Sequence, residues 1–136
     1  MINFNYETAF SLDNEAQLFE WIVGVISSEG HKLEEVNYIF CDDAYLLKLN
    51  VEFLNHDTLT DIISFDYSVG KIIQGDIFIS VERVADNAHD FNVSLHEELQ
   101  RVMVHGVLHY CGYKDKSESD SKLMRQKEEH YLKQLA

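Results

Sequence analysis

The residues best suited to do chemistry lie between His105 and Asp115, in the segment His-Gly-Val-Leu-His-Tyr-Cys-Gly-Tyr-Lys-Asp. If this segment begins as a helix, His105 and His109 project from one face and can reach one metal ion. Gly112 can adopt a positive φ, end the helix and turn the chain, which brings Asp115 toward the same ion. A His-x-x-x-His pair alone is also compatible with two ordinary, partly exposed histidines. The turn at Gly112 is therefore what favours a metal site.

Zinc accepts histidine nitrogen and carboxylate oxygen, and three protein ligands leave the open position that is typical of catalytic sites. The spacing resembles that of the metzincin peptidases, His-Glu-x-x-His-x-x-Gly-x-x-His. In those enzymes a glutamate after the first histidine acts as the base, and here Gly106 stands in its place. We therefore expect no conventional peptidase. Because Asp115 is anionic, a bound water would be less acidic than in a three-histidine site, and the reaction would need an additional electrophile.

Alternating and helical hydrophobic patterns predict the elements that position this segment. The predicted strands cover residues 2–6, 33–41, 62–67 and 72–80, the last two as a hairpin punctuated by Gly70 and Gly75 with a bulge. Five helices are predicted. The first begins at a cap at Asp13 or Ser11 and ends at Gly30, and the fourth begins at the Ser94 capping box and ends at Gly112. The other three cover residues 42–54, with a cap at 42–43, residues 81–90 and residues 118–135. The first of these has an apolar stripe that includes Phe19. We expect an α+β fold in a single domain over residues 1–136, with a small mixed sheet of about four strands covered by about five helices. Strand order is left open.

The composition argues against a general nucleic-acid-binding protein and against a membrane protein. The chain has 11 basic and 24 acidic residues, a net charge of −13, whereas general nucleic-acid binders are basic. Residues 1–113 hold 19 of the acidic residues and 5 of the basic ones, so an RNA would need a local site or a partner. We find no apolar run near the ~20 residues of a membrane span and no secretion signal, and the two cysteines suit free thiols. We therefore expect a cytoplasmic protein without a membrane or DNA partner.

Several motifs together resemble the YbeY family of bacterial rRNA maturation factors, whose hallmark is His-Gly-x-Leu-His-x-x-Gly-Tyr-Asp-His. The chain matches it at His105, Gly106, Leu108, His109, Gly112 and Tyr113, with Lys114-Asp115 in place of Asp-His. Further family signatures are matched by Leu49-Asn50, by residues 60–65, by residues 75–77 and by Glu98-Leu99. The resemblance implies a metal-dependent, single-strand-specific endoribonuclease with one Zn²⁺ on His105, His109 and Asp115. It also implies 16S rRNA 3′-end maturation, ribosome quality control, and contact with the small ribosomal subunit or its proteins.

One departure concerns the phosphate-binding cation. The family places an arginine implicated in cleavage where this chain has Leu54, which cannot neutralise a phosphate. Arg101, one helical turn before His105, and Arg83 are candidate substitutes, although each also fits a solvated surface arginine. We predict His105 and Arg101 as the catalytic residues.

Two other functions stay open: a non-catalytic, zinc-stabilised ribosome-assembly factor, favoured by Leu54 and the acidity, and a hydrolase of small molecules at the same metal. Asp61 and Asp76 fit turn caps or supports of metal ligands, with the structural role favoured. Tyr110 and Tyr113 fit either aromatic packing or stacking on a base.

Overall fold

The computed structural model describes residues 1–135 of the chain. Its elements, in chain order, are β1 (Ile2–Tyr6), α1 (Glu15–Ser28), β2 (Lys32–Cys41), α2 (Asp43–Leu54), β3 (Ile62–Asp66), β4 (Ile72–Ser80), α3 (Val81–Asp90), α4 (Leu95–Tyr110) and α5 (Glu118–Leu132). This confirms the predicted α+β class with four strands and five helices in the described part of the chain.

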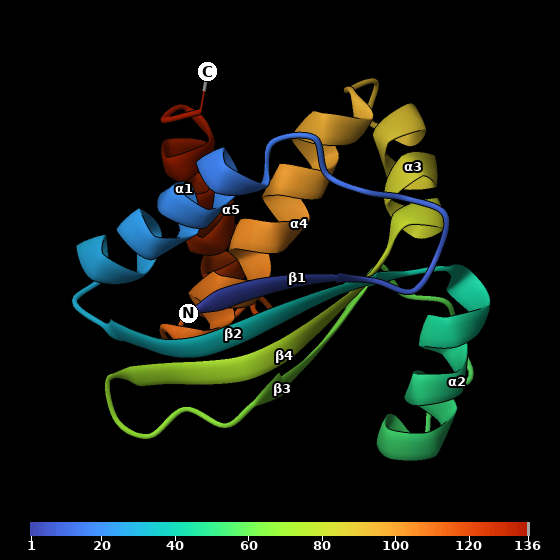
Figure 1. Ribbon diagram of the computed structural model, residues 1–136, viewed down its shortest axis with the longest axis horizontal. Helices are drawn as coiled ribbons and strands as arrows, with labels where there is room; N and C mark the ends of the chain where they lie inside the picture. Colours follow the sequence, from blue (N-terminus) through green and yellow to red (C-terminus); the bar gives the residue numbers. More distant parts are fainter. Residues whose placement is uncertain (136) are drawn as a thin grey trace.

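The four strands form one mixed sheet in the order β1-β2-β4-β3. The pairs β1–β2 and β2–β4 are parallel, and only the hairpin strand β3 runs antiparallel to β4 among the described residues. Parallel neighbours need a crossover connection, and α1 supplies the one between β1 and β2. Figure 1 shows α1, α4 and α5 stacked over one face of the sheet.

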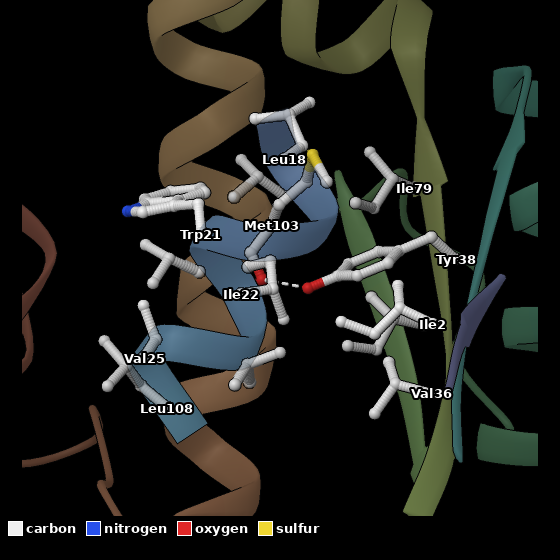
Figure 2. Close-up of a cluster of buried hydrophobic side chains, with 14 of the residues drawn as sticks. Ile2, Leu18, Trp21, Ile22, Val25, Val36, Tyr38, Ile79, Met103 and Leu108 are labelled. Atoms are coloured by element: carbon white, nitrogen blue, oxygen red, sulfur yellow. Dashed lines mark hydrogen bonds between the residues drawn. The ribbon is translucent and has the colours of Figure 1, made fainter. Parts of the chain in front are cut away.

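The main core fills the space between α1, α4 and this face of the sheet. In Figure 2 side chains from β2 and β4 point toward α1 and α4, with Tyr38 at the centre. The Tyr38 hydroxyl donates to the carbonyl of Met103 in α4 at 2.9 Å, so its polar atom is satisfied inside the core. This contact fixes α4 over the sheet two residues before His105.

Helix α2 lies on the other side of the sheet, at one end (Figure 1), over a smaller core of Cys41, Leu46 and Ile63. Both cysteines are free, as expected for isolated thiols, and burial raises the pKa of Cys41 to about 12. No helix in residues 1–135 is both long and apolar enough to cross a membrane.

Three local predictions were wrong. Helix α1 is capped by Asn14 without a side-chain bond, not by Asp13 or Ser11, and Phe19 is exposed because the helix faces the core through Leu18, Ile22 and neighbouring residues. Gly75 marks no bulge; the irregularity lies in β2, between Leu33 and Glu35. Gly75 is needed because a Cβ there would lie 2.5 Å from the Tyr110 hydroxyl.

Candidate metal centre

Helix α4 brings the two histidines to the surface of the main core. The Ser94 hydroxyl caps its first turn by accepting from the Glu97 amide at 3.1 Å. Gly106 faces the sheet, where a Cβ would lie 3.0 Å from the Ile77 side chain and 3.1 Å from that of Ile62. The helix therefore packs close against the sheet at the position where the metzincins carry their glutamate, and leaves little room there for a side chain.

The third side chain arrives through the turn predicted at Gly112. This residue has a φ of +104°, and its amide donates to the carbonyl of His109 at 3.0 Å. The Tyr113 amide donates to the Leu108 carbonyl at 3.1 Å, which closes the end of the helix. The chain then runs back past the last turn of α4, and Asp115 reaches the two histidines.

Ligand atoms from His105, His109 and Asp115 converge on one point. The two Nε2 atoms are 3.0 Å apart, and Asp115 Oδ2 lies 3.2 Å from that of His105 and 3.3 Å from that of His109. A tetrahedral zinc ion with bonds of about 2.0–2.1 Å separates its ligands by about 3.3 Å. The spacing of the three atoms thus fits a single ion of this kind.

The hydrogen bonds behind the histidines determine which nitrogen faces the metal position. His109 Nδ1 lies 2.9 Å from the carbonyl of Tyr113, which can only accept, so this nitrogen carries the proton. His105 Nδ1 lies 2.7 Å from Glu128 Oε2 and donates to it in the same way. In the neutral imidazoles both Nε2 atoms then present lone pairs to each other at 3.0 Å, beside a carboxylate oxygen. A cation between these atoms, either a proton or a metal ion, relieves the repulsion, and the donor set of two nitrogens and one oxygen suits a metal ion.

A cleft of about 340 Å³ opens beside His105 and Asp115. Its walls come from the start of β3 and from α3, α4 and α5, and its acidic lining residues are Asp61, Glu98, Asp115 and Glu128. Burial raises the pKa of Asp61 and of Glu98. Burial opposes protonation of His105, but the carboxylates of Glu128 and Asp115 outweigh it and raise its pKa.

Arg101 lines the same cleft, as its position one turn before His105 predicted. Its side chain is only 13% exposed and forms ion pairs with Glu129 at 2.9 Å, Glu128 at 3.3 Å and Glu98 at 3.7 Å. The guanidinium is thus engaged by carboxylates of the protein. Arg125, which also lines the cleft, is 56% exposed, and its nearest ion-pair contact is 3.8 Å from Glu128.

The other candidates for the absent family arginine lie elsewhere. Arg83 pairs with Asp43 at 3.1 Å and with Asp86 at 2.8 Å, which joins α2 to α3. Leu54, the last residue of α2, is exposed. Neither is among the described residues that line the cleft.

The remaining candidates have structural contacts. Asp76 accepts from Asn37 at 2.9 Å on the sheet face away from α4, whereas Asp61 accepts from Asn87 at 3.3 Å at the cleft. The Tyr110 hydroxyl donates to the carbonyls of Phe65 and Asp76 at 2.9 and 3.0 Å, so it packs α4 onto the sheet. The Tyr113 hydroxyl donates to Glu29 at 2.6 Å and anchors the turn to α1.

Glu128 was not predicted as part of the site. It is buried on α5, on the same stripe as Met124 and Tyr131. A glutamate at a core-facing position of an amphipathic helix is a signal that sequence reasoning could have used, because such residues are rarely buried without a partner. Its partners, His105 and Arg101, lie more than 20 residues earlier in the chain, so the pattern names no contact.

Comparison with known proteins gives consistent results over almost the whole chain. The family model for Endoribonuclease YbeY matches residues 2–136. A Flavobacterium johnsoniae protein named Endoribonuclease YbeY is 70% identical over 132 residues, covering 97% of this chain and 95% of the relative. A protein of the same name from Flavobacterium psychrophilum is 61% identical over 133 residues, which cover 98% of this chain and 95% of that relative. A solution structure of a Thermotoga maritima protein superposes with a TM-score of 0.70 at 28% identity, covering 97% of this chain and 87% of that one.

Fold and site define a small α+β protein with a group of side chains able to hold a metal ion. The matches are more specific: the chain belongs to the Endoribonuclease YbeY family. The resemblance found in the sequence is thereby confirmed, and the family is one of enzymes named for internal cleavage of RNA.

Proposed function

We propose that this protein is a zinc-dependent, single-strand-specific endoribonuclease that acts in 16S rRNA 3′-end maturation and ribosome quality control. The whole chain would act as one metal-dependent hydrolase domain. The observation that carries the proposal is the convergence of His105, His109 and Asp115 beside a cleft that His105 and Asp115 line, in a member of a family of RNA-cleaving enzymes.

The chain's own residues would divide the work as follows. His105 and His109 would bind the ion through Nε2, held in the correct tautomer by Glu128 and by the Tyr113 carbonyl. Asp115 would supply the third ligand and one negative charge. A zinc ion bound there would polarise a phosphodiester oxygen and acidify water. His105 is predicted both as a metal ligand and as a catalytic residue, and in this scheme it would act as a ligand.

Charge in the cleft makes RNA binding depend on the metal. The four acidic lining residues outnumber the two arginines, so the metal-free cleft repels phosphate. Arg125 is the more exposed of the two and the better placed to meet a phosphate, whereas the three carboxylate partners of Arg101 favour a role in holding those side chains. The assignment of Arg101 as catalytic stays a prediction.

Phe91 supports the preference for single strands. It lines the cleft and is 58% exposed, so its ring is available to a base. Stacking on an aromatic ring requires an unpaired base and tolerates any sequence. We expect the small ribosomal subunit or its proteins to bring the rRNA to this acidic protein, which places the activity in the cytoplasm.

Single-turnover cleavage of a 16S rRNA 3′ fragment by zinc-loaded protein tests the proposal. We expect slow cleavage within single-stranded sequence that is lost on chelation and in His105→Ala. Equal cleavage by the His105→Ala protein would assign the activity to a contaminating nuclease and overturn the proposal.

The net charge of −13 and the leucine at position 54 favour the non-catalytic alternative, a zinc-stabilised ribosome-assembly factor. That reading predicts binding to the small subunit without cleavage. Wild-type protein that binds zinc and the subunit but leaves the RNA intact would support it instead.

A further inference from the structure

We propose that Glu128 is a positioning residue of the metal centre, which orients His105 and strengthens its bond to the ion from the far side of the ring. The inference rests on the proposed metal site and deepens it. It assigns a part in that site to α5, a helix that contributes none of the three ligands.

The contact has the geometry of a carboxylate–histidine–metal relay. Glu128 Oε2 lies 2.7 Å from His105 Nδ1. The other ring nitrogen of His105, Nε2, faces Asp115 and His109. An ionised carboxylate can only accept, so His105 must donate through Nδ1 and present the Nε2 lone pair to the ion. Such a partner fixes the ring and raises its basicity as a ligand.

Glu128 is itself held in place, which a positioning residue requires. Its side chain is 7% exposed, and its other oxygen, Oε1, accepts from Arg101 at 3.3 Å. Arg101 also pairs with the buried Glu98 of α4 at 3.7 Å, so charged groups from α4 and α5 hold Glu128 against His105. With both oxygens used and little access to water, Glu128 has few alternative orientations.

The two histidines are supported unequally. His109 donates to a neutral backbone carbonyl, that of Tyr113, whereas His105 donates to a carboxylate. A charged acceptor forms the stronger hydrogen bond. Loss of the Glu128 carboxylate should therefore weaken the metal centre specifically through His105.

Glu129 provides a matched control. It is the next residue on α5, carries the same charge and also pairs with Arg101, but its side chain is 50% exposed and its only ion pair among the described residues is that one. Glu128→Gln and Glu129→Gln remove the same charge from adjacent positions. Only the first changes the group that accepts from His105.

The experiment measures zinc affinity by competition with a chromophoric chelator, and the visible spectrum of the Co²⁺-substituted protein. We expect Glu128→Gln to bind zinc about 10- to 100-fold more weakly than wild type, with altered Co²⁺ bands. Glu129→Gln should stay within about twofold of wild type, with an unchanged spectrum. If Glu128→Gln binds zinc as tightly as wild type, or if both variants weaken it equally, the inference is wrong.

Two further results separate this inference from the proposed function. Wild-type protein that binds no zinc contradicts the metal site itself, whereas tight wild-type binding with no effect of Glu128→Gln contradicts only the role of Glu128. If Glu128→Gln does not fold, NMR of ¹⁵N-histidine-labelled, zinc-loaded wild type decides. We expect a protonated His105 Nδ1, and a zinc bond at that nitrogen would overturn the assignment.

Discussion

Replacing Arg101 by alanine tests whether this arginine stabilises the fold by pairing with the protein's own carboxylates. Its removal leaves the buried Glu98 without its cation and the buried Glu128 with only His105 and a 3.8 Å contact to Arg125, while the half-exposed Glu129 loses little. Breaking a buried ion pair by removing one partner costs about 3–5 kcal/mol. Because the carboxylates here retain some contact with the cleft, we expect a loss near the lower end, about 3 kcal/mol.

Urea unfolding of metal-free protein, followed by circular dichroism, measures this loss. With an m-value of roughly 2 kcal/mol per M, a loss of about 3 kcal/mol lowers the midpoint by about 1.5 M. Arg125→Ala is the control, since its side chain is 56% exposed and its ion pair is long at 3.8 Å. We expect the control to lose no more than about 0.5 kcal/mol. Equal midpoints for the two variants would refute the reasoning and would restore Arg101 as a residue free to act on RNA.

Three other predictions follow, two of them from substitutions and one from the residue at position 106. Gly112→Ala forces alanine into a φ of +104°, so we expect a loss of about 1–3 kcal/mol in urea unfolding and weaker zinc binding, because the turn delivers Asp115. Burial favours the protonated form of Glu29, but hydrogen bonds from two tyrosines outweigh burial and hold the pKa of this carboxyl below its usual value. The stability that Glu29 contributes is therefore present above about pH 4.3 and is lost as the pH falls through the lower folded pKa. Unfolding curves of wild type and Glu29→Gln should therefore differ at pH 7 and converge in acid; a constant difference would contradict this. Because Gly106 cannot accept a proton, zinc-loaded protein should not digest casein, and zinc-dependent digestion that His109→Ala abolishes would overturn that prediction.

Local signals were sufficient for most of the fold. Alternation and helical periodicity located the nine elements, and the capping serine at position 94 and the glycine at position 112 marked the ends of α4. The order β1-β2-β4-β3 could not be predicted, because strand pairing depends on contacts between segments far apart in the chain. The bulge was misplaced for a related reason: Gly75 is required by close contacts with the Phe65 carbonyl of β3 and with Tyr110, a residue 35 positions later.

The ligands of the candidate site could also be predicted from local sequence, whereas the residues that support them could not. His105, His109 and Asp115 lie within eleven residues, and helix geometry with one glycine turn was enough to predict that they meet. The groups behind them come from elsewhere: Glu128 from α5 to His105, and Glu29 from the end of α1 to the Tyr113 turn. Arg101 was correctly placed beside His105, but its three carboxylate partners could not be read from spacing alone.

Diffraction from crystals of the zinc-loaded protein, with anomalous data collected on both sides of the zinc absorption edge, tests the central claim most directly. We predict one zinc peak at about 2.0–2.2 Å from Nε2 of His105, Nε2 of His109 and a carboxylate oxygen of Asp115, with a further coordination position open to the cleft. A zinc ion bound elsewhere, such as on the Cys111 thiol, or a fourth protein ligand closing the site would contradict it.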